Sequence, residues 1–122
     1  MISFLTGSIA MGVVFLYGCL GETITEKAGN LNLGIPGIMA LGALGGCLGV
    51  NVYFGIFGDG KIIWIFLVLC TLLLACLFGA LGGLIYAFLT VTLQANQNVT
   101  GLVLTTFGVG IGNFFGGSLF VL

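Results

Sequence analysis

The chain has 122 residues, of which 60% are hydrophobic and 4% charged, with no histidine, a net charge of −1 and a mean hydropathy of +1.36. Soluble domains carry about 25% charged residues, so this composition predicts a membrane protein. Two basic residues are too few for a surface that binds nucleic acid or anionic lipid headgroups, and we exclude nucleic acid as a partner.

The apolar stretches predict an all-α fold, because a membrane-spanning helix needs roughly 20 consecutive apolar residues. We expect a polytopic transmembrane helix bundle with about four membrane segments, at residues 2–20, 31–57, 62–93 and from 99 onward. The first segment has no basic residues before it and exceeds the h-region of a signal peptide, which favours a retained helix. The third segment could be one helix or two.

Three charges follow the first segment, and two of them, Glu22 and Glu26, are four residues apart. On a continuous helix the two carboxylates would share a face with Lys27 close by. They could form an intramembrane proton or cation relay, since buried carboxylates usually have a function. They could equally be solvated charges at the membrane interface, because the first span ends there by length.

The second segment is interrupted by glycine and proline, at Gly34, Pro36 and Gly37, directly after Asn30 and Asn32. In lipid, a broken helix survives only where protein or a wet cavity satisfies its free backbone groups. Amide side chains both donate and accept hydrogen bonds, which suits an uncharged, hydroxyl-rich ligand. These five residues are therefore candidates for a substrate pathway, and an ordinary capped turn is the alternative.

A second polar group, QANQN at residues 94–98, separates the third and fourth segments. Asn96 and Gln97 are further candidates for the substrate pathway. The alternative is a solvated loop between two membrane helices.

Glycine makes up 23 of the 122 residues, and many glycines are spaced four apart. Residues four apart share one side of a helix, and small-xxx-small faces let two membrane helices approach closely. The candidate helix-packing positions are Gly42, Gly46, Gly79, Gly83, Gly108, Gly112 and Gly116.

The four cysteines form no C-x-x-C pair and have no histidine partners, so zinc, haem and thioredoxin-like spacings are all missing. We expect them to be small apolar packing residues, and we predict no metal site, no catalytic residue and no cofactor.

The fourth segment is still apolar at its last residue, whereas membrane proteins usually close a final span with a polar or basic tail. We therefore expect residues 1–122 to be a single transmembrane domain that forms the N-terminal portion of a longer chain. Lys27 and Lys61 flank the second segment on opposite sides, so the positive-inside rule leaves the orientation open.

Two motifs resemble one known family. The stretch EKAGNLNLGIPGIM at residues 26–39, followed by LGA at 41–43, is similar to the N-terminal signature of bacterial ABC-importer permeases. The nearest branch is the one linked to basic-membrane-protein-type binding lipoproteins, which imports nucleosides, with ribose and branched-chain amino acid permeases beyond it. The stretch ANQNVTGL at residues 95–102 is similar to a second recurrent motif of that branch.

The resemblance implies a transmembrane permease domain in the bacterial cytoplasmic membrane, covering about the first 40% of such a permease. It implies a second permease subunit, identical or paralogous, a cytoplasmic ATP-binding subunit and an extracytoplasmic substrate-binding lipoprotein. The chain has no G-x-x-x-x-G-K-[ST] motif, in agreement with a subunit that is not an enzyme. Many relatives carry glutamate where this chain has Pro36, so a role of that carboxylate is not carried over.

The leading hypothesis is a permease subunit of an ABC importer that forms part of the translocation pathway for nucleosides or simple sugars. The alternative is a small self-contained membrane protein, a pore or structural subunit, that oligomerises through its glycine faces. An intramembrane enzyme is disfavoured because the chain lacks histidine.

Overall fold

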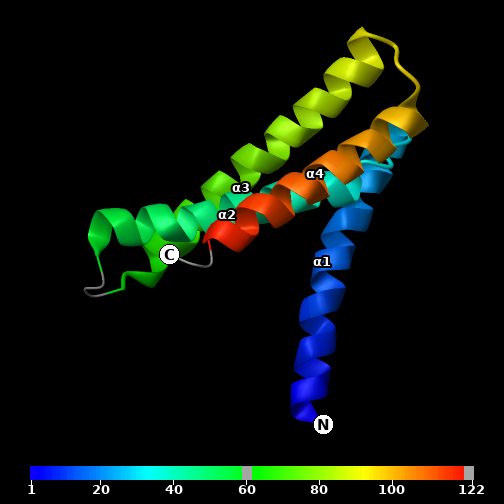
Figure 1. The fold of residues 1–122 in the computed structure, drawn as a ribbon. Helices are drawn as coiled ribbons and strands as arrows, with labels where there is room; N and C mark the ends of the chain where they lie inside the picture. Colours follow the sequence, from blue (N-terminus) through cyan, green and yellow to red (C-terminus); the bar gives the residue numbers. More distant parts are fainter. Residues whose placement is uncertain (59–61, 120–122) are drawn as a thin grey trace.

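The computed structural model describes residues 1–58 and 62–119, and its long elements are four helices (Figure 1). They are α1 (Ile2–Lys27), α2 (Ile35–Phe57), α3 (Trp64–Ala87), which continues into a π-helical turn η1 (Phe88–Thr92), and α4 (Gln97–Leu119). All four are long and apolar enough to cross a membrane. The predicted all-α bundle with four membrane segments is confirmed. Lys61, which follows the second predicted segment, lies outside the described residues.

Helix α1 extends seven residues beyond the end predicted at residue 20, so the sequence-based boundary was wrong. No glycine at positive φ or proline interrupts the helix before Gly29, and the charged residues stay on its last turns. The helix ends where Gly29 adopts φ +88°, with Gly29 N–H donating to Glu26 O at 2.9 Å and Asn30 N–H to Thr25 O at 3.1 Å. This Schellman pair turns the chain sharply and delivers Asn30 to the junction with α2.

Helix α2 begins at Ile35, and the preceding residues 31–34 are not helical. The predicted interruption within the second segment is therefore corrected: Gly34, Pro36 and Gly37 lie at the start of a continuous helix. Pro36 suits this place because a first-turn residue has no intrahelical partner for an N–H. The helix ends at Gly58, where φ is +65°.

The third segment is one continuous helix from Trp64 to Thr92, which resolves the choice between one helix and two. Its last turn, η1, widens to the π-helical form, with Leu93 N–H donating to Phe88 O at 3.1 Å. Gln94 then adopts φ +50° and the chain turns toward α4.

Helix α2 packs against α3 and α4 through glycines. A Cβ built at Gly45 would lie 2.5 Å from Leu74 O, and one built at Gly49 would lie 2.6 Å from Thr71 Cα. The residue numbers of the contacts fall along α3 as they rise along α2, so the two helices are antiparallel. Such close backbone approach drives helix association in lipid, where the hydrophobic effect is absent.

Helix α4 runs parallel to α2 and packs on a different face of α2 from α3. Gly101 lies against Gly34, and further along both helices Gly108 lies against the backbone of Gly37. The side chain of Leu104 is buried between these contacts, with 4% of its surface exposed. Helix α2 is therefore the central element of the described bundle.

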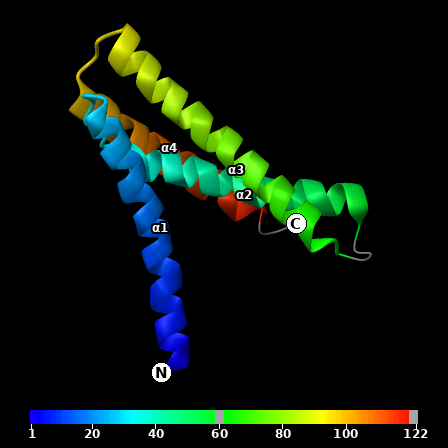
Figure 2. The ribbon, with the colours of Figure 1, turned by 180° about the vertical axis from the view of Figure 1, so that it is seen from behind.

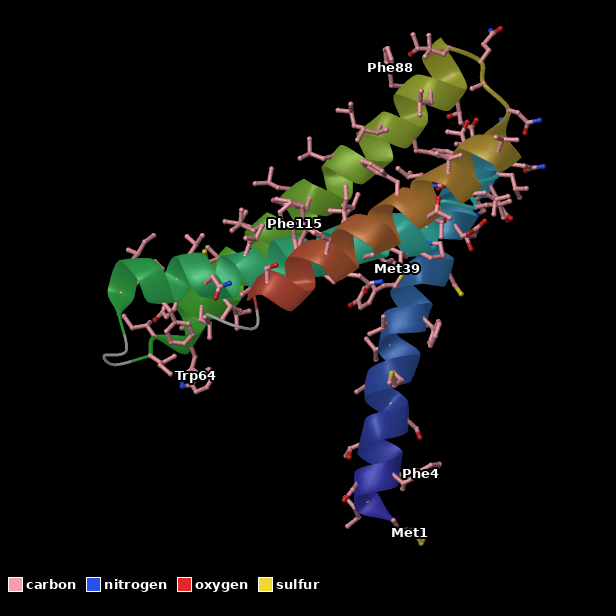
Figure 3. The ribbon with its side chains drawn as sticks, in the orientation of Figure 1. Met1, Phe4, Met39, Trp64, Phe88 and Phe115 are labelled. Atoms are coloured by element: carbon pink, nitrogen blue, oxygen red, sulfur yellow. The ribbon has the colours of Figure 1, made fainter. Side chains whose placement is uncertain are left out.

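Helix α1 projects away from the other three helices (Figures 1 and 2). Among the described helices, its backbone comes close only to that of α2, and none of its residues is fully buried. The contact is near Met39, whose Sδ would lie 3.0 Å from a Cβ at Gly18, while Met1 and Phe4 lie at the distant end (Figure 3). The C-terminal end of α1 is thus the part that meets the bundle.

Candidate functional site: a polar hollow at the α1–α2 junction

The loop between α1 and α2 is anchored through the backbone of Leu31. Its N–H donates to Gln97 Oε1 at 2.9 Å, and its carbonyl accepts a hydrogen bond from the Tyr86 hydroxyl at 2.6 Å. These partners come from α4 and α3, more than 50 residues along the chain. The peptide groups of this irregular segment are thereby hydrogen-bonded by side chains of two other helices.

Gln97 also holds the side chain of Asn30. Its Nε2 donates to Asn30 Oδ1 at 3.0 Å while its Oε1 accepts from Leu31 N–H. One amide side chain therefore fixes a neighbouring amide and the adjacent peptide group together.

The start of α2 is fixed in a similar way. Asn32 Oδ1 accepts a hydrogen bond from Gly34 N–H at 2.9 Å, and Thr105 Oγ1 donates to Leu33 O at 2.7 Å. The first bond is an Asx turn directly before α2, which satisfies the N–H of the N-cap residue Gly34.

These elements border an open hollow of about 370 Å³ between the end of α1, the start of α2 and the end of α3. Its wall is mostly apolar, and we call it the polar hollow after the polar side chains among its lining residues. Pockets for small molecules begin at about 300 Å³. Its lining includes the polar side chains of Thr25, Asn30, Asn32, Tyr86 and Thr90, among apolar residues and two glycines.

The most enclosed polar side chains of the hollow are Asn32, Tyr86 and Thr90, with 4%, 3% and 7% of their surfaces exposed. Buried polar groups are costly in an apolar setting unless they are hydrogen-bonded. Thr90 Oγ1 donates to Tyr86 O at 2.8 Å, and Thr25 Oγ1 donates to Gly21 O at 2.8 Å. The hollow therefore has hydroxyl and amide groups and no charged side chain among its lining residues.

Of the predicted pathway residues, Asn30 and Asn32 line this hollow. Gln97 lies behind Asn30 as its hydrogen-bond partner. Asn96 is exposed, and its Oδ1 caps α4 by accepting from Asn98 N–H at 3.0 Å.

The glycines of the break have a packing role. Gly34 and Gly37 are buried against α4, and a Cβ at either would meet backbone or side-chain atoms of that helix. Their contacts are those of helix packing.

Pro36 faces a different hollow, of about 410 Å³, between α1 and α2. Its lining is largely apolar and includes the half-buried carboxylate of Glu22. Glu26 and Lys27 are exposed on the last turn of α1, a placement that fits the interfacial interpretation of these charges.

The candidate packing glycines differ in how closely other helices approach them, and they form three groups. A Cβ at Gly108 would overlap the Gly37 carbonyl, whereas one at Gly42, Gly46 or Gly112 would make ordinary contacts at 3.5 to 3.9 Å. Gly79, Gly83 and Gly116 have no atom within 4 Å of such a Cβ. For these three, packing stays a prediction about contacts with other elements.

The sequence interpretation missed Tyr86 and Thr90. They are four residues apart near the end of an otherwise apolar segment, so they share one helix face. That spacing of two hydroxyl groups was the available signal.

In the part of the chain that the structure describes, no three His, Cys, Asp or Glu side chains come together as a metal site would require. The four cysteines are free, and Cys47 and Cys70 are half-buried.

Comparison with known proteins assigns the chain to a family. The profile described as branched-chain amino acid transport system permease component matches residues 4–121. A putative glucose ABC transporter permease protein of Haloferax volcanii is 37% identical over 115 residues, which is 92% of this chain and 30% of that protein.

Two further relatives are nucleoside permeases. The guanosine ABC transporter permease protein of Bacillus subtilis is 32% identical over 91 residues, 75% of this chain and 27% of its own length. The nucleoside ABC transporter permease protein of Lactococcus lactis is 30% identical over 99 residues, 81% of this chain and 29% of its own length.

The chain thus spans less than a third of the length of each of these relatives. No solved structure matches it significantly. The resemblance read from the two sequence motifs is confirmed: the chain is a multi-pass protein of the cell membrane and belongs to the permease-component family of branched-chain amino acid transport systems.

Proposed function

We propose that the chain forms part of the permease subunit of an ABC importer for an uncharged, hydroxyl-bearing solute, a simple sugar or a nucleoside. The observation that carries the proposal is the convergence of Asn30, Asn32, Tyr86 and Thr90 on one hollow beside a break between two membrane helices. Amide and hydroxyl groups can replace the water around such a solute. Irregular backbone between membrane helices is tolerated where protein covers it or where it lines a water-filled cavity.

The relatives support the same solute classes, because their names refer to glucose, guanosine and nucleosides. The family profile covers nearly the whole chain, which favours the permease over a self-contained oligomeric pore. The tentative pathway residues are Asn30 and Asn32, with Gly34, Pro36, Gly37, Asn96 and Gln97 in supporting positions around the junction.

The proposal includes partners and excludes intrinsic chemistry. The permease would pair with a second permease subunit, receive solute from an extracytoplasmic binding lipoprotein and move it when a cytoplasmic subunit hydrolyses ATP. The chain itself would contribute a pathway, so we expect it to have no enzymatic activity and to need no cofactor.

Thr90→Val in the complete transporter tests the pathway. Valine keeps the shape of threonine, and the lost hydroxyl is bonded only within its own helix, so folding should change little. Thr71→Val is the matched control, since the Thr71 hydroxyl also donates only within the third segment's helix, to Leu67 O and Val68 O, away from the hollow.

The measurement is the initial rate of uptake of radiolabelled glucose and guanosine at solute concentrations well below saturation, where the rate reports solute binding, with membrane protein quantified. We expect Thr90→Val to reduce the rate about twofold to tenfold, the effect of one lost hydrogen bond, and Thr71→Val to leave it unchanged. Equal rates in the two variants would contradict the site. Uptake of neither solute by the wild-type transporter would contradict the function.

A further inference from the structure

The hydrogen bonds around the polar hollow give each asparagine a fixed orientation. Asn32 Oδ1 accepts from Gly34 N–H, and Asn30 Oδ1 accepts from Gln97 Nε2. In both cases the oxygen atom is the one engaged by protein. The nitrogen atoms of both amides have no acceptor among the described residues.

The free nitrogen of Asn32 is also reachable. Only 4% of the surface of Asn32 is exposed, yet no fully buried side-chain nitrogen or oxygen among the described residues lacks a hydrogen-bond partner. Asn32 Nδ2 is therefore not fully buried, and Asn32 is one of the residues that line the polar hollow.

The hydroxyl groups of the hollow complete the pattern. The protons of Thr25, Thr90 and Tyr86 are each donated to a backbone carbonyl, at 2.8, 2.8 and 2.6 Å. Their oxygen atoms can still accept. Among the side chains that line the hollow, the unpaired donors are consequently the amide N–H groups of Asn30 and Asn32.

We infer that the polar hollow recognises its solute by donating hydrogen bonds to acceptor atoms, such as hydroxyl, carbonyl or ring-nitrogen atoms, and that Gln97 is the positioning residue that sets this polarity. Gln97 Oε1 already accepts a hydrogen bond from Leu31 N–H, so Gln97 Nε2 is the atom that faces Asn30. Because Nε2 can only donate, the Asn30 amide turns its oxygen atom toward Gln97. This inference rests on the proposed function, and it narrows the solute class to acceptor-bearing uncharged molecules.

The substitution Gln97→Glu reverses the arrangement with little change of shape. A carboxylate can accept from Leu31 N–H but cannot donate to Asn30 Oδ1, so the Asn30 amide would turn to donate its nitrogen. Its oxygen would then face the hollow, which loses one donor and gains one acceptor. Gln97 is the first residue of α4, where a negative charge interacts favourably with the helix dipole, so the variant should fold.

Asn98→Asp is the matched control. It introduces the same charge one residue later in the first turn of α4, and the Asn98 side chain is exposed and makes no hydrogen bond within the described residues. Asn30→Ala and the double variant Asn30→Ala/Gln97→Glu complete a thermodynamic cycle, because a residue that acts through Asn30 should have no effect in its absence.

The readout is the dissociation constant of radiolabelled guanosine and of glucose, measured by equilibrium dialysis on the purified permease–ATPase complex without its binding lipoprotein. For the solute that the wild type binds, we expect Gln97→Glu to weaken binding about fivefold to tenfold, the effect of one lost hydrogen bond and one opposed acceptor. Asn98→Asp should bind like the wild type. The double variant should match Asn30→Ala.

Three outcomes would overturn the inference. They are unchanged binding in Gln97→Glu, equal weakening in Gln97→Glu and Asn98→Asp, and a further loss when Gln97→Glu is added to Asn30→Ala. If Thr90→Val still lowers uptake selectively in any of these cases, the proposed function stands and only the role of Gln97 fails. A wild-type transporter that neither binds nor takes up either solute would overturn both.

Discussion

Gly108 of α4 lies directly against the carbonyl group of Gly37 in α2, and a Cβ at Gly108 would overlap that oxygen atom. Gly37 in turn faces the backbone of Leu104 and Thr105. This contact brings Thr105 to the carbonyl of Leu33, at 2.7 Å, and so places the start of α2 beside α4. A packing contact between two glycines therefore helps to fix the geometry of the polar hollow.

Gly108→Ala should destabilise the bundle, because the added methyl group must push two backbones apart. Overpacking of this kind costs about 1–3 kcal/mol. Gly110→Ala, in the same helix, meets no atom within 4 Å and should be neutral or slightly stabilising. The check is the temperature at which the detergent-solubilised transporter loses its monodisperse elution peak. Equal temperatures for the two variants would contradict the close α2–α4 contact.

The α2–α3 contact makes a second prediction, which distinguishes neighbouring glycines of α2. A Cβ at Gly49 would lie 2.6 Å from Thr71 Cα, whereas one at Gly46 would lie 3.9 Å from the Ala75 side chain. Gly49→Ala should therefore reduce the amount of folded protein in the membrane, and Gly46→Ala should not. Quantitative blotting of solubilised protein measures this, and a loss confined to Gly46→Ala would show that the helices are rotated from the described arrangement.

Tyr86→Phe should impair uptake more than stability, because it frees the carbonyl of Leu31 between the two asparagines of the hollow. One neutral hydrogen bond contributes about 0.5–1.5 kcal/mol. Tyr53→Phe is the matched control, since it removes a similar bond, to Ile63 N–H at 2.9 Å, at the other end of α2. Both variants should lose similar thermal stability, and only Tyr86→Phe should slow glucose or guanosine uptake. Equal slowing in both would assign Tyr86 a purely structural role.

The four spans could be predicted because composition alone sets the solvent and the length of each apolar run sets the number of crossings. The end of α1 could not be predicted in this way, because the end of the apolar run does not set the end of the helix. The helix continues through Glu22 and Glu26 to the first residue that needs a positive φ, Gly29. Helix ends follow backbone geometry as well as polarity.

The sequence predicted the part of the candidate site that Asn30 and Asn32 form. It did not predict the part that Tyr86 and Thr90 form. Tyr86 contacts Leu31 across 55 residues of sequence, and nothing local to either residue indicates that pairing. Gln97 was predicted as a pathway residue from its polarity, while its hydrogen bonds to Asn30 and Leu31 make it a brace behind the hollow.

The most direct test of the central claim is whether solute occupies the polar hollow. Thr90→Cys would be introduced into a transporter whose native cysteines, Cys19, Cys47, Cys70 and Cys76, are replaced by serine or alanine. The rate of modification by a small methanethiosulfonate reagent would be measured with and without saturating glucose or guanosine. Thr71→Cys on the same helix is the control. The account predicts that the transported solute slows modification at Thr90→Cys and leaves Thr71→Cys unaffected. An unchanged rate at Thr90→Cys in a variant that still takes up solute would contradict it.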